Sequence, residues 1–351
     1  MKYDSNIIDD SFTIRMALAK LNNLVYKDSL TLFVINNAHQ LIGTITDGDI
    51  RRGLLNGLTL DDNITTVVHT NFRFLKASNI ALEELAKFKE KEISLIPIIN
   101  DEGQIKRIIN LRHTKTILPL DAVIIAGGEG RRLRPMTENT PKPLLKVGDK
   151  PIIEYNIDRI NFFGIHHLNI TIKYLGQQII DHFGDGQSRG LRINYIWEKA
   201  QALGTIGSLT LAENLIHDNV LVMNSDLLTN IDFEDMYNTF VQTEADMIVA
   251  TVPYEVKIPY GVLETDGSQI TSLKEKPTYT YYSNAGIYML KRRLIELIPK
   301  GQKHDATDLM MTLIQNNYKV VQYPILGYWL DIGKPEDFSK AQEDVKHINF
   351  T

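Results

Sequence analysis

The chain has 351 residues, enough for two or three compact domains, and 43% of them are hydrophobic, which indicates folded cores. Its 38 Lys and Arg against 43 Asp and Glu give a net charge of −5 without a basic run, which argues against a nucleic-acid partner. The absence of cysteine excludes disulfides, thiolate nucleophiles and cysteine-ligated metals. Without a signal-like N-terminus or an apolar run near ~20 residues, we expect a soluble cytoplasmic protein.

An internal repeat occupies the first third of the chain. Residues 32–45 align with residues 96–109 in one register, and three aligned pairs are identical: Asn36/Asn100, Gln40/Gln104 and Ile45/Ile109. Each copy has the pattern of strand, polar turn and strand. Segments with helical spacing of apolar residues precede the copies, at 14–24 and at 80–88. The repeat predicts two units that pack around a shared core.

A second domain is predicted to begin near residue 119. The pattern lapses over residues 114–120, and a buried-strand run follows at 122–126. Apolar runs then alternate with helical periodicity, which is typical of an α/β domain. We therefore predict two domains, at residues 1–118 and 119–351. The expected elements are strands at 122–126, 168–172, 220–223 and 247–252, and a helix whose first turn contains Pro151 and whose end is Gly164.

A loop rich in glycine and arginine directly follows the first of these strands, where ligands bind in open parallel sheets. Gly127, Gly128 and Gly130 allow backbone N–H groups to approach an anion closely, and Arg132 supplies a planar cation for phosphate oxygens. The alternative is a connector that only turns the chain. The later Pro-Lys-Pro at 141–143 favours the phosphate site.

Two other phosphate-binding motifs are excluded at this loop. A Walker loop needs Gly-Lys-Ser or Gly-Lys-Thr after a four-residue gap, and the sequence lacks it. The dinucleotide-binding fingerprint needs a third glycine where Leu133 stands. An NAD-type oxidoreductase is therefore not expected.

From this loop onward, the ordered motifs resemble those of sugar-1-phosphate nucleotidylyltransferases, over most of residues 121–345. They are Gly127-Gly128-x-Gly130-x-Arg132-Leu133-x-Pro135-x-Thr137, Pro141-Lys142-Pro143-Leu144, Lys150-Pro151-Ile152-Ile153-Glu154 and, more loosely, Asp226, Glu275-Lys276-Pro277 and Trp329-Leu330-Asp331-Ile332-Gly333. Members of that family join a nucleoside triphosphate to a sugar 1-phosphate and release pyrophosphate. The resemblance implies a Rossmann-like, mostly parallel α/β sheet.

This chemistry needs cations more than a general base. The attacking phosphate has a second pKa near ~6 and is already ionised at neutral pH, so the obstacle is repulsion between two polyanions. The resemblance implies that Arg132 and Lys142 bind the triphosphate and that Lys276 holds the sugar phosphate. It also implies that Asp226 and Asp331 share a Mg²⁺ ion. Taken singly, Asp226 would be interpreted as a turn residue and Asp331 as a helix cap.

The resemblance also implies a nucleotide pocket lined by seven residues: Ala126, Gly127, Gly128, Gly130, Glu198, Gly204 and Thr205. Glu198 stands where the family places Gln or Glu at the edge of the base. A carboxylate only accepts hydrogen bonds, and guanine offers adjacent N–H donors, so Glu198 favours GTP by ~1–3 kcal/mol if it is desolvated. A solvated glutamate at a strand end, with UTP, dTTP or CTP as the substrate, stays open.

Residues 1–118 resemble a pair of CBS (cystathionine-β-synthase-type) motifs, an α+β arrangement that commonly binds adenine nucleotides. Thr46 and Asp49 match the positions that hold the ribose. In the second copy Asn110 and His113 occupy these places, so at most one intact site is expected. A structural or dimerising role is the alternative. Since CBS pairs tend to assemble face to face, the resemblance implies a homo-oligomer.

On the sugar side, the resemblance implies contacts from Gly261, Glu275, Lys276 and Asn284. A CBS pair ahead of this transferase also resembles enzymes that make GDP-aminosugars for nonulosonic-acid synthesis. Glucosamine 1-phosphate is therefore one candidate substrate and mannose 1-phosphate another. A catalytically inactive binding regulator on the same fold is the alternative function, and the joint retention of the cations and carboxylates argues against it.

Overall fold

The computed structural model describes residues 3–25, 27, 29–77, 82–198, 203–348 and 350. The chain divides into two compact units. The first comprises Met1–Ile117 with Phe162–Gly164 and Gly186–Gly190, and the second comprises Leu118–Asn161, Ile165–Asp185 and Leu191–Thr351. Among the described residues, every helix is too short or too polar to span a lipid bilayer.

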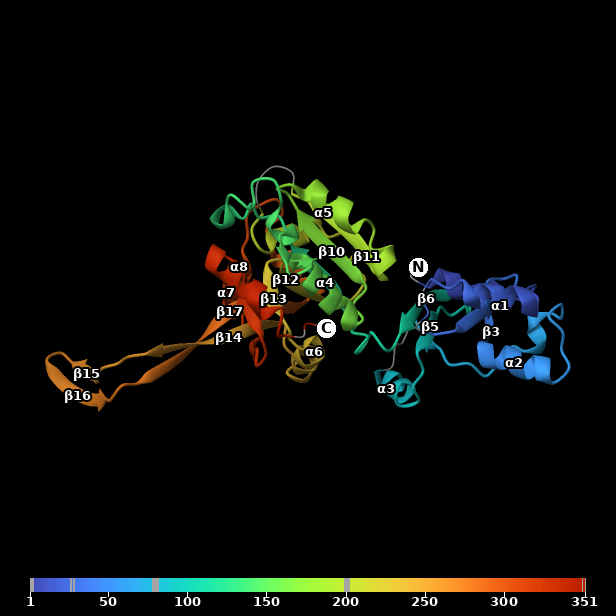
Figure 1. Cartoon of the computed structure of the whole chain (residues 1–351). Coiled ribbons are helices and arrows are strands. Elements are labelled where there is room, and N and C mark those ends of the chain that lie inside the picture. The colour runs from blue at the N-terminus through green and yellow to red at the C-terminus, as the bar shows by residue number, and fades with distance from the viewer. Residues whose placement is uncertain are drawn as a thin grey trace. The chain divides into compact units, whose positions relative to one another are not determined.

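The first unit contains two three-stranded sheets of the same design (Figure 1). Their strands are β1 (Ile7–Asp9), β2 (Thr31–Ile35) and β3 (Leu41–Thr46), and β4 (Leu75–Lys76), β5 (Leu95–Ile99) and β6 (Ile105–Asn110). In each sheet the first pair is parallel and the second is an antiparallel hairpin with a bulge at the equivalent place. The strand pattern predicted for the two repeats is therefore confirmed.

The helices of the first unit follow the repeat only in part. They are α1 (Ile14–Asn22), α2 (Asp47–Leu55) and α3 (Leu82–Glu90), with short 3-10 helices η1 (Asp4–Asn6) and η2 (Ile64–Thr66). The helix expected at 80–88 begins at Leu82 as described, and residues 80 and 81 lie outside the described ranges. The second copy ends without a counterpart of α2, since the described residues 111–120 contain no helix.

Contacts between the two polar turns explain why the repeat keeps its Asn and Gln pairs. The side-chain oxygen of Asn36 accepts from the backbone N–H of Gln40 at 2.9 Å, and Asn100 does the same for Gln104 at 2.7 Å. The amide of Gln40 donates to the carbonyl of Glu102, and that of Gln104 donates to the carbonyl of Ala38. The reciprocal pattern gives the unit an internal two-fold relation.

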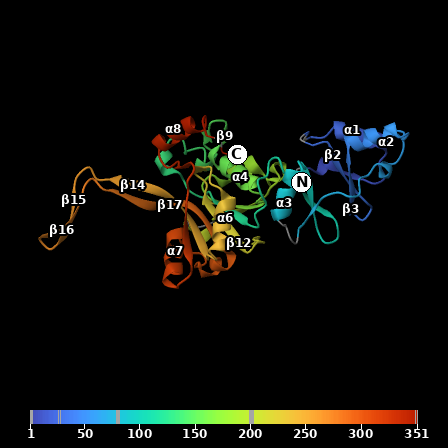
Figure 2. The ribbon, with the colours of Figure 1, turned by 90° about the horizontal axis from the view of Figure 1, so that it is seen from below.

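A seven-stranded sheet with the order β11-β10-β7-β12-β17-β14-β18 forms the centre of the second unit (Figures 1 and 2). Its strands are β7 (Asp121–Ile125), β10 (His167–Ile172), β11 (Arg192–Trp197), β12 (Asn219–Asn224), β14 (Met247–Lys257), β17 (Thr278–Lys291) and β18 (Val320–Pro324). Neighbouring strands are parallel except where β17 runs antiparallel to both β12 and β14. The predicted α/β class with a mostly parallel sheet is confirmed.

The remaining elements of this unit are short. Its α-helices are α4 (Ile152–Phe162), α5 (Gly176–Phe183), α6 (Phe233–Gln242), α7 (Ala306–Gln315) and α8 (Pro335–Asp344). Two small ladders pair β8 (Lys146–Val147) with β9 (Lys150–Pro151), and β13 (Leu227–Thr229) with β19 (Trp329–Asp331). Its 3-10 helices are η3 (Arg131–Leu133), η4 (Lys142–Leu144), η6 (Gly207–Leu211) and η7 (Arg292–Leu297), whereas η5 (Gln187–Arg189) belongs to the first unit.

Pro151 corrects one predicted boundary. It was expected in the first helical turn, but it ends β9, opposite Lys146, and α4 begins at Ile152. Proline lacks the backbone N–H of a strand interior, so the end of a two-residue strand suits it as well as a first helical turn does.

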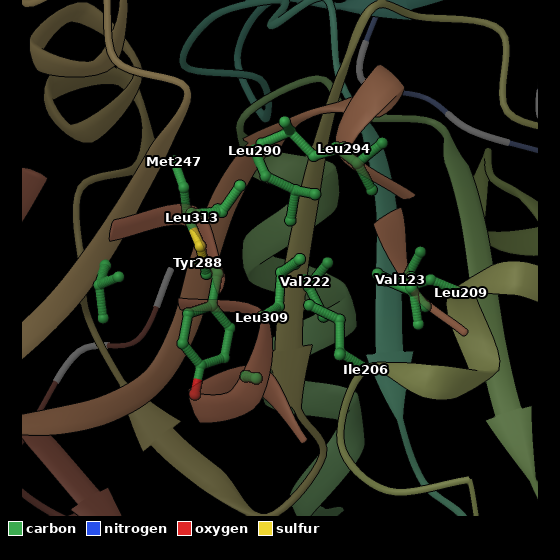
Figure 3. Packing of buried hydrophobic residues seen from close by; sticks show 14 residues of the cluster. Val123, Ile206, Leu209, Val222, Met247, Tyr288, Leu290, Leu294, Leu309 and Leu313 are labelled. Carbon is green, nitrogen blue, oxygen red and sulfur yellow. The ribbon is translucent and has the colours of Figure 1, made fainter. Parts of the chain in front are cut away.

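Packing of apolar side chains fixes α7 and η6 on one face of the sheet (Figure 3). Val123 and Val222 come from adjacent parallel strands, and Leu309 and Leu313 lie one helical turn apart on α7. All four are almost fully buried. Truncation of such a residue to alanine typically costs about 2–5 kcal/mol, so this cluster holds the strand ends in place.

Strands β14 and β17 continue beyond the sheet as a two-stranded ribbon (Figures 1 and 2). The predicted strand at 247–252 thus extends to Lys257. The ribbon ends in the hairpin of β15 (Val262–Asp266) and β16 (Gln269–Lys274). Residues 252–283 of this segment, here called the arm, are mostly exposed, whereas residues 247–251 of β14 are buried.

Candidate active site

The carboxyl ends of the two central parallel strands lie side by side. Ile125, the last residue of β7, pairs with Asn224, the last residue of β12. Ser225 continues this pairing by donating its N–H to the carbonyl of Ile125 at 3.1 Å. The glycine–arginine loop leaves β7 here, and Asp226 follows β12 directly, so two of the predicted motifs share one edge of the sheet.

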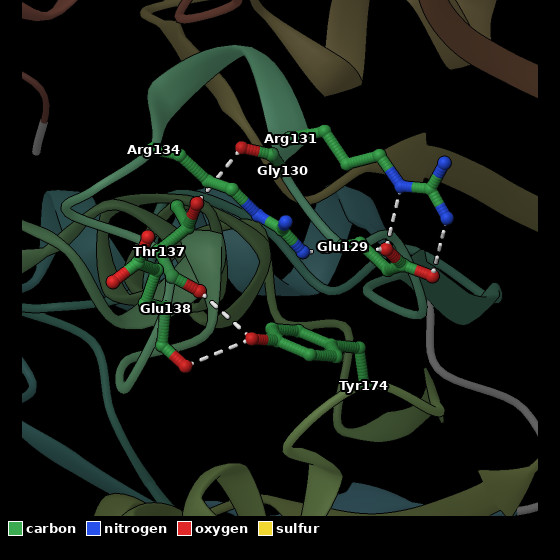
Figure 4. A network of polar contacts seen from close by, with 7 residues as sticks. All are labelled: Glu129, Gly130, Arg131, Arg134, Thr137, Glu138 and Tyr174. Atoms are coloured by element: carbon green, nitrogen blue, oxygen red, sulfur yellow. Dashed lines mark hydrogen bonds and ion pairs between the residues drawn. The ribbon is translucent and has the colours of Figure 1, made fainter.

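Gly130 fixes the shape of the glycine–arginine loop. Its φ of 62° is left-handed, and a Cβ atom placed on it would lie 2.9 Å from the Cβ of Lys142. The Thr137 hydroxyl donates to the Gly130 carbonyl at 2.9 Å, and the Tyr174 hydroxyl lies within hydrogen-bond distance of the Thr137 and Glu138 carbonyls (Figure 4). These contacts close the loop against Lys142.

The three arginines of this loop have different partners. Arg131 forms two hydrogen bonds with Glu129, at 2.6 and 3.2 Å, and Arg134 approaches the same carboxylate at 3.8 Å (Figure 4). The hydrogen bond from Arg131 is the main reason why the pKa of Glu129 is lowered. Arg132 has no ion pair within the described ranges, and its guanidinium would lie 3.2 Å from a Cβ placed on Gly333. Arg132 is therefore available to an anion.

Asp226 and Asp331 come together through the β13–β19 ladder. Leu227, the residue after Asp226, pairs with Asp331, and Ile332 donates its N–H to the carbonyl of Asp226 at 3.0 Å. Lys142 forms a direct ion pair with Asp226, and Lys142 is only 9% exposed. Asp226 thus contacts a buried ammonium group directly, and Asp331 lies close enough for the charge of that group to act on its pKa.

The charges that shift the pKa of Asp331 show that Asp331, Asp226, Lys142 and Arg132 lie in one site. Desolvation raises the pKa of Asp331 above its usual value, and the negative charge of Asp226 raises it further. The positive charges of Lys142 and Arg132 act in the opposite direction and only partly compensate. The structure therefore brings together four of the five predicted catalytic residues.

Glu198 lies at the end of β11, beside the glycine loop. It is 6% exposed, and its Oε2 atom accepts a hydrogen bond from the N–H of Leu203 at 2.9 Å. Its Oε1 atom would lie 3.3 Å from a Cβ on Gly127, so Gly127 leaves room for this carboxylate. A Cβ on Gly128 would meet nothing within 4 Å, which leaves open space beside the loop. Ala126, also predicted here, is buried and continues the ladder to Thr171.

Gly204 and Thr205 are fastened to the start of α7. A Cβ on Gly204 would lie 2.6 Å from both Asp305 and the His304 carbonyl, and its φ is 76°. The N–H of Thr205 donates to Asp305 at 2.9 Å, while its hydroxyl accepts from the N–H of Ala306 at 2.8 Å. Lys199, Ala200, Gln201 and Ala202 of the predicted pocket segment lie outside the described residues.

The predicted sugar-side residues are divided between the sheet and the arm. Asn284 accepts from the N–H of Gly286 at 2.9 Å and donates to the Tyr288 hydroxyl at 2.8 Å. A Cβ on Gly286 would clash with Asn224, which places this segment beside the end of β12. The arm, in contrast, carries Gly261, Glu275 and Lys276. Six ladder positions, about 20 Å, separate Asn284 from Thr278, so the structure does not bring these three residues to the site.

Thr46 and Asp49 in the first unit form a capping box at the start of α2. Thr46 is the N-cap, and the Asp49 carboxylate accepts from both the backbone N–H of Thr46 at 2.7 Å and its hydroxyl at 2.6 Å. Arg52 also pairs with Asp49. Burial opposes ionisation of Asp49, but the bonds from Thr46 and Arg52 outweigh it, and its pKa is lowered. These side chains therefore already have structural partners.

Lys173, Asp305 and Asp337 were missed by the sequence reasoning. Lys173 follows β10, and its Cβ would lie 3.5 Å from a Cβ on Gly127, so the strand-end rule could have found it. Asp337 accepts from the N–H groups of Gly333 and Lys334, and its charge helps to raise the pKa of Asp331. In sequence, Asp305 and Asp337 look like ordinary helix-start carboxylates.

The candidate metal ligands at this site are a pair of carboxylates. Within the described part of the chain, no three His, Asp or Glu side chains gather in a group that could hold an ion. Asp226 and Asp331 form this pair, since Asp226 directly precedes β13 and Asp331 ends the strand paired with it. This number suits a cation that takes its remaining oxygens from a bound phosphate and water.

Comparison with known proteins assigns the second unit. The chain is 32% identical over 232 residues to the mannose-1-phosphate guanylyltransferase of Mycobacterium tuberculosis, and this covers 64% of each chain. It is 28% identical to the D-glycero-alpha-D-manno-heptose 1-phosphate guanylyltransferase of Aneurinibacillus thermoaerophilus, covering 65% of this chain and 99% of the relative. It is 30% identical to the UTP–glucose-1-phosphate uridylyltransferase of Synechocystis, covering 63% of this chain and 62% of the relative.

A solved structure gives the same assignment. The chain resembles a Bacillus anthracis protein assigned as a glucose-1-phosphate thymidylyltransferase, with a TM-score of 0.53, 25% identity, and coverage of 66% of this chain and 97% of that one. The chain spans just under two thirds of the mycobacterial and cyanobacterial relatives. The Nucleotidyl transferase family matches residues 121–348, which is more than half of the sequence. By this match, the chain belongs to the nucleotidyl transferase family.

Proposed function

We propose that the chain transfers a nucleoside monophosphate from a nucleoside triphosphate to a sugar 1-phosphate. An oxygen of the sugar phosphate attacks the α-phosphorus, the bond from that phosphorus to the oxygen of the β-phosphate breaks, and pyrophosphate leaves. The observation that carries this proposal is the gathering of Arg132, Lys142, Asp226 and Asp331 at the carboxyl edge of the sheet. The named relatives perform reactions of this class.

The cations lower the barrier by neutralising charge. Both substrates are polyanions, so the attacking and leaving oxygens must be held in line while repulsion is screened. Arg132, which is not tied to Glu129, binds the triphosphate and the leaving pyrophosphate in this proposal. Lys142 is fixed by its ion pair and by contact with Gly130, so its ammonium needs little reorganisation during the reaction. A general base is unnecessary because the sugar phosphate is ionised at neutral pH.

Asp226 and Asp331 fit a divalent cation such as Mg²⁺. Their mutual repulsion contributes to the raised pKa of Asp331, and a bound cation would relieve it. The ion would supply further neutralisation of phosphate oxygens. In the chain itself, the β13–β19 ladder fixes the spacing of the carboxylates, and Lys142 holds Asp226 in orientation.

For the base, we propose guanine, recognised by Glu198. The carboxylate is buried, one oxygen is occupied by Leu203, and the other faces the glycine loop. An acceptor in this position matches the adjacent N–H donors of guanine. Both guanylyltransferases named above are relatives of this chain. A uridylyltransferase is also a relative, so base choice needs its own test.

We propose a hexose or hexosamine 1-phosphate as the acceptor, with Asn284 at the sugar. A role for Lys276 at its phosphate requires the arm to bring that residue closer to the site than the structure places it. In the first unit, we propose a CBS-type pair in which Thr46 and Asp49 form the better-preserved nucleotide position. Their capping box means that an adenine nucleotide would have to share or replace existing hydrogen bonds. A shift of the melting temperature or of the turnover rate on addition of AMP or ATP tests this part. No shift in either assay leaves only the structural role.

The transferase proposal is tested by measuring pyrophosphate release with five nucleoside triphosphates crossed with a panel of sugar 1-phosphates. We expect Mg²⁺-dependent turnover with GTP, and glucosamine 1-phosphate and mannose 1-phosphate among the acceptors. A strong preference for UTP would remove the role given to Glu198. Binding of both substrates without turnover under any combination would identify a catalytically inactive regulator.

A further inference from the structure

Lys173 lies between the glycine loop and Glu198 at the carboxyl edge of the central sheet. Strand β10 runs between β7 and β11, and Figure 1 shows it beside β11. The ladder of β10 with β11 ends one residue before Lys173 and Glu198, and the ladder of β10 with β7 ends two residues before Lys173 and Gly127. Continued in register, the two ladders align Lys173 with Glu198 on one side and with Gly127 on the other.

The contacts around Gly127 agree with this alignment. A Cβ atom placed on Gly127 would lie 3.5 Å from the Cβ of Lys173 and 3.3 Å from the Oε1 atom of Glu198. The N–H of Glu198 donates to the carbonyl of Ile172 at 3.0 Å, so the ladder of β10 and β11 continues as far as Glu198. The side chains of Lys173 and Glu198 therefore flank the same glycine.

The ammonium group of Lys173 is uncommitted. Among the residues that the structure describes, it has neither a hydrogen bond nor an ion pair, and its side chain is partly buried. The pKa of Glu129 is lowered mainly by its hydrogen bond from Arg131, and the positive charge of Lys173 adds to this effect. The ammonium group thus lies within range of the glycine loop, where it is available to an oxygen of a ligand.

Lys173 stands nearer to the base end of the site than to its phosphate end. The ladder of β12 with β7, continued in register by two residues, aligns Asp226 with Gly127. Neighbouring strands lie about 5 Å apart, so the backbone of Lys173 is one strand from Glu198 and two strands from Asp226. The phosphate-binding cations proposed above gather around Asp226. Lys173 is therefore placed to contact the base.

A carboxylate beside an ammonium group matches one class of base. Guanine, uracil and thymine carry a carbonyl oxygen next to a ring N–H, whereas adenine and cytosine carry an amino group next to an unprotonated ring nitrogen. The carboxylate of Glu198 only accepts hydrogen bonds, and the ammonium group of Lys173 only donates them. The two side chains therefore fit a keto base, but an amino base would set donor against donor and acceptor against acceptor.

We propose that Lys173 is a specificity-determining residue, which donates to the carbonyl oxygen of the base while Glu198 accepts from the adjacent N–H. This inference rests on the proposed function, which places the base beside Glu198. In guanine, the oxygen bound by Lys173 is O6, and the ring N–H and the 2-amino group are left to Glu198. Lys173 thereby selects keto bases over adenine and cytosine.

Lys173→Met tests this role with three triphosphates that differ at the edge of the base. They are GTP, ITP, which lacks the 2-amino group, and 2-aminopurine riboside triphosphate, which lacks the carbonyl oxygen. In pyrophosphate-release assays, kcat/KM of the variant should fall about 10–100-fold with GTP and with ITP, the usual effect of losing a hydrogen bond to a charged group. With the 2-aminopurine substrate it should stay within about threefold of the wild type, because that base offers lysine no oxygen.

Two further variants control this comparison. Lys173→Arg should keep most of the activity with GTP, since arginine also donates hydrogen bonds. Lys146→Met removes an exposed lysine of β8 and should leave kcat/KM unchanged with all three substrates. An equal loss with all three substrates in Lys173→Met would assign Lys173 to the phosphates and overturn the proposal. An unchanged kcat/KM with GTP would overturn it as well.

Nucleotide binding separates this inference from the proposed function. A wild type that releases no pyrophosphate with any triphosphate contradicts the transferase reaction but not the base contact. In that case, Lys173→Met should still weaken the binding of GMP at least about tenfold in calorimetry and leave the binding of 2-aminopurine riboside monophosphate unchanged. An equal effect on both nucleotides, no effect on either, or a wild type that does not bind GMP overturns the role of Lys173.

Discussion

At the scale of single residues, the site depends on a few close backbone approaches. Gly130 is required both for its left-handed φ and for the approach of Lys142, whereas Gly128 borders open space. Arg132 rests beside Gly333, where an added Cβ atom would lie 3.2 Å from its guanidinium. Glycine in these motifs thus has three different physical roles: backbone conformation, packing of a catalytic side chain, and room for a ligand.

Gly130→Ala should destabilise the protein and lower turnover, because the new Cβ is strained and displaces Lys142. We expect a loss of about 1–3 kcal/mol in the free energy of unfolding, measured by chemical denaturation. Gly128→Ala is the matched control. It should leave the unfolding free energy unchanged and instead raise KM for the triphosphate. Equal stability of the two variants would contradict the assigned role of Gly130.

Asp331→Asn should stabilise the fold in metal-free buffer while abolishing turnover. The pKa of Asp331 is raised by desolvation and by Asp226, so the folded state favours the protonated form. The stability that protonation contributes is lost as pH rises through the raised pKa. The gain in Tm of the variant should therefore be small near pH 4 and reach up to about 3 °C at pH 8. A variant that melts below the wild type at pH 8 in EDTA would contradict this account.

At the scale of elements, short ladders and helix starts bring distant residues together. The β13–β19 ladder joins Asp226 to Asp331, and the N-cap of α7 holds the loop that contains Thr205. Neither element forms part of the central sheet, yet each positions a predicted site residue. Substitutions in the β13–β19 ladder or at the N-cap of α7 should therefore change both the stability of the fold and the affinity for substrate.

Asp305→Ala should raise KM for the triphosphate about tenfold, because the variant loses the hydrogen bond to Thr205 and loosens the pocket loop. Loss of an N-cap also costs about 1 kcal/mol. Asp232→Ala removes the N-cap of α6 and should lower Tm similarly with KM unchanged. Steady-state kinetics and thermal melting distinguish the two effects. A similar rise in KM for both variants would show that general destabilisation is the cause.

Much of the central sheet could be predicted because the residues within each of its inner strands already show the strand pattern. Strands β7, β10 and β12 are short, largely buried runs rich in apolar residues, and each lies within a residue or two of its predicted bounds. The length of β14 could not be predicted, since beyond Val252 it alternates polar and apolar residues and is stabilised only by pairing with β17. The proximity of Asp226 and Asp331 also depends on a long-range ladder. The order of the family motifs indicated that Asp226 and Asp331 lie close together, but the spacing of the residues could not have shown it.

At the scale of the whole molecule, the chain combines a repeat unit with a nucleotidyl transferase unit. The repeat keeps its two-fold contacts through Asn36, Gln40 and their counterparts, while its second copy ends without a helix in the described residues. The transferase unit carries all four clustered charges. We therefore expect substitutions in the capping box of Thr46 to change stability or regulation more than the chemical step.

The most direct test of the charge-neutralisation account compares two neighbouring arginines. Arg131 is held by Glu129, whereas Arg132 faces the carboxylates and Gly333. In pyrophosphate-release assays, Arg132→Ala should lower kcat/KM by about 10²–10³, the usual cost of removing a group that stabilises developing charge. Arg131→Ala should stay within about threefold of the wild type. Near-normal turnover of Arg132→Ala, or an equal loss in both variants, would contradict the account.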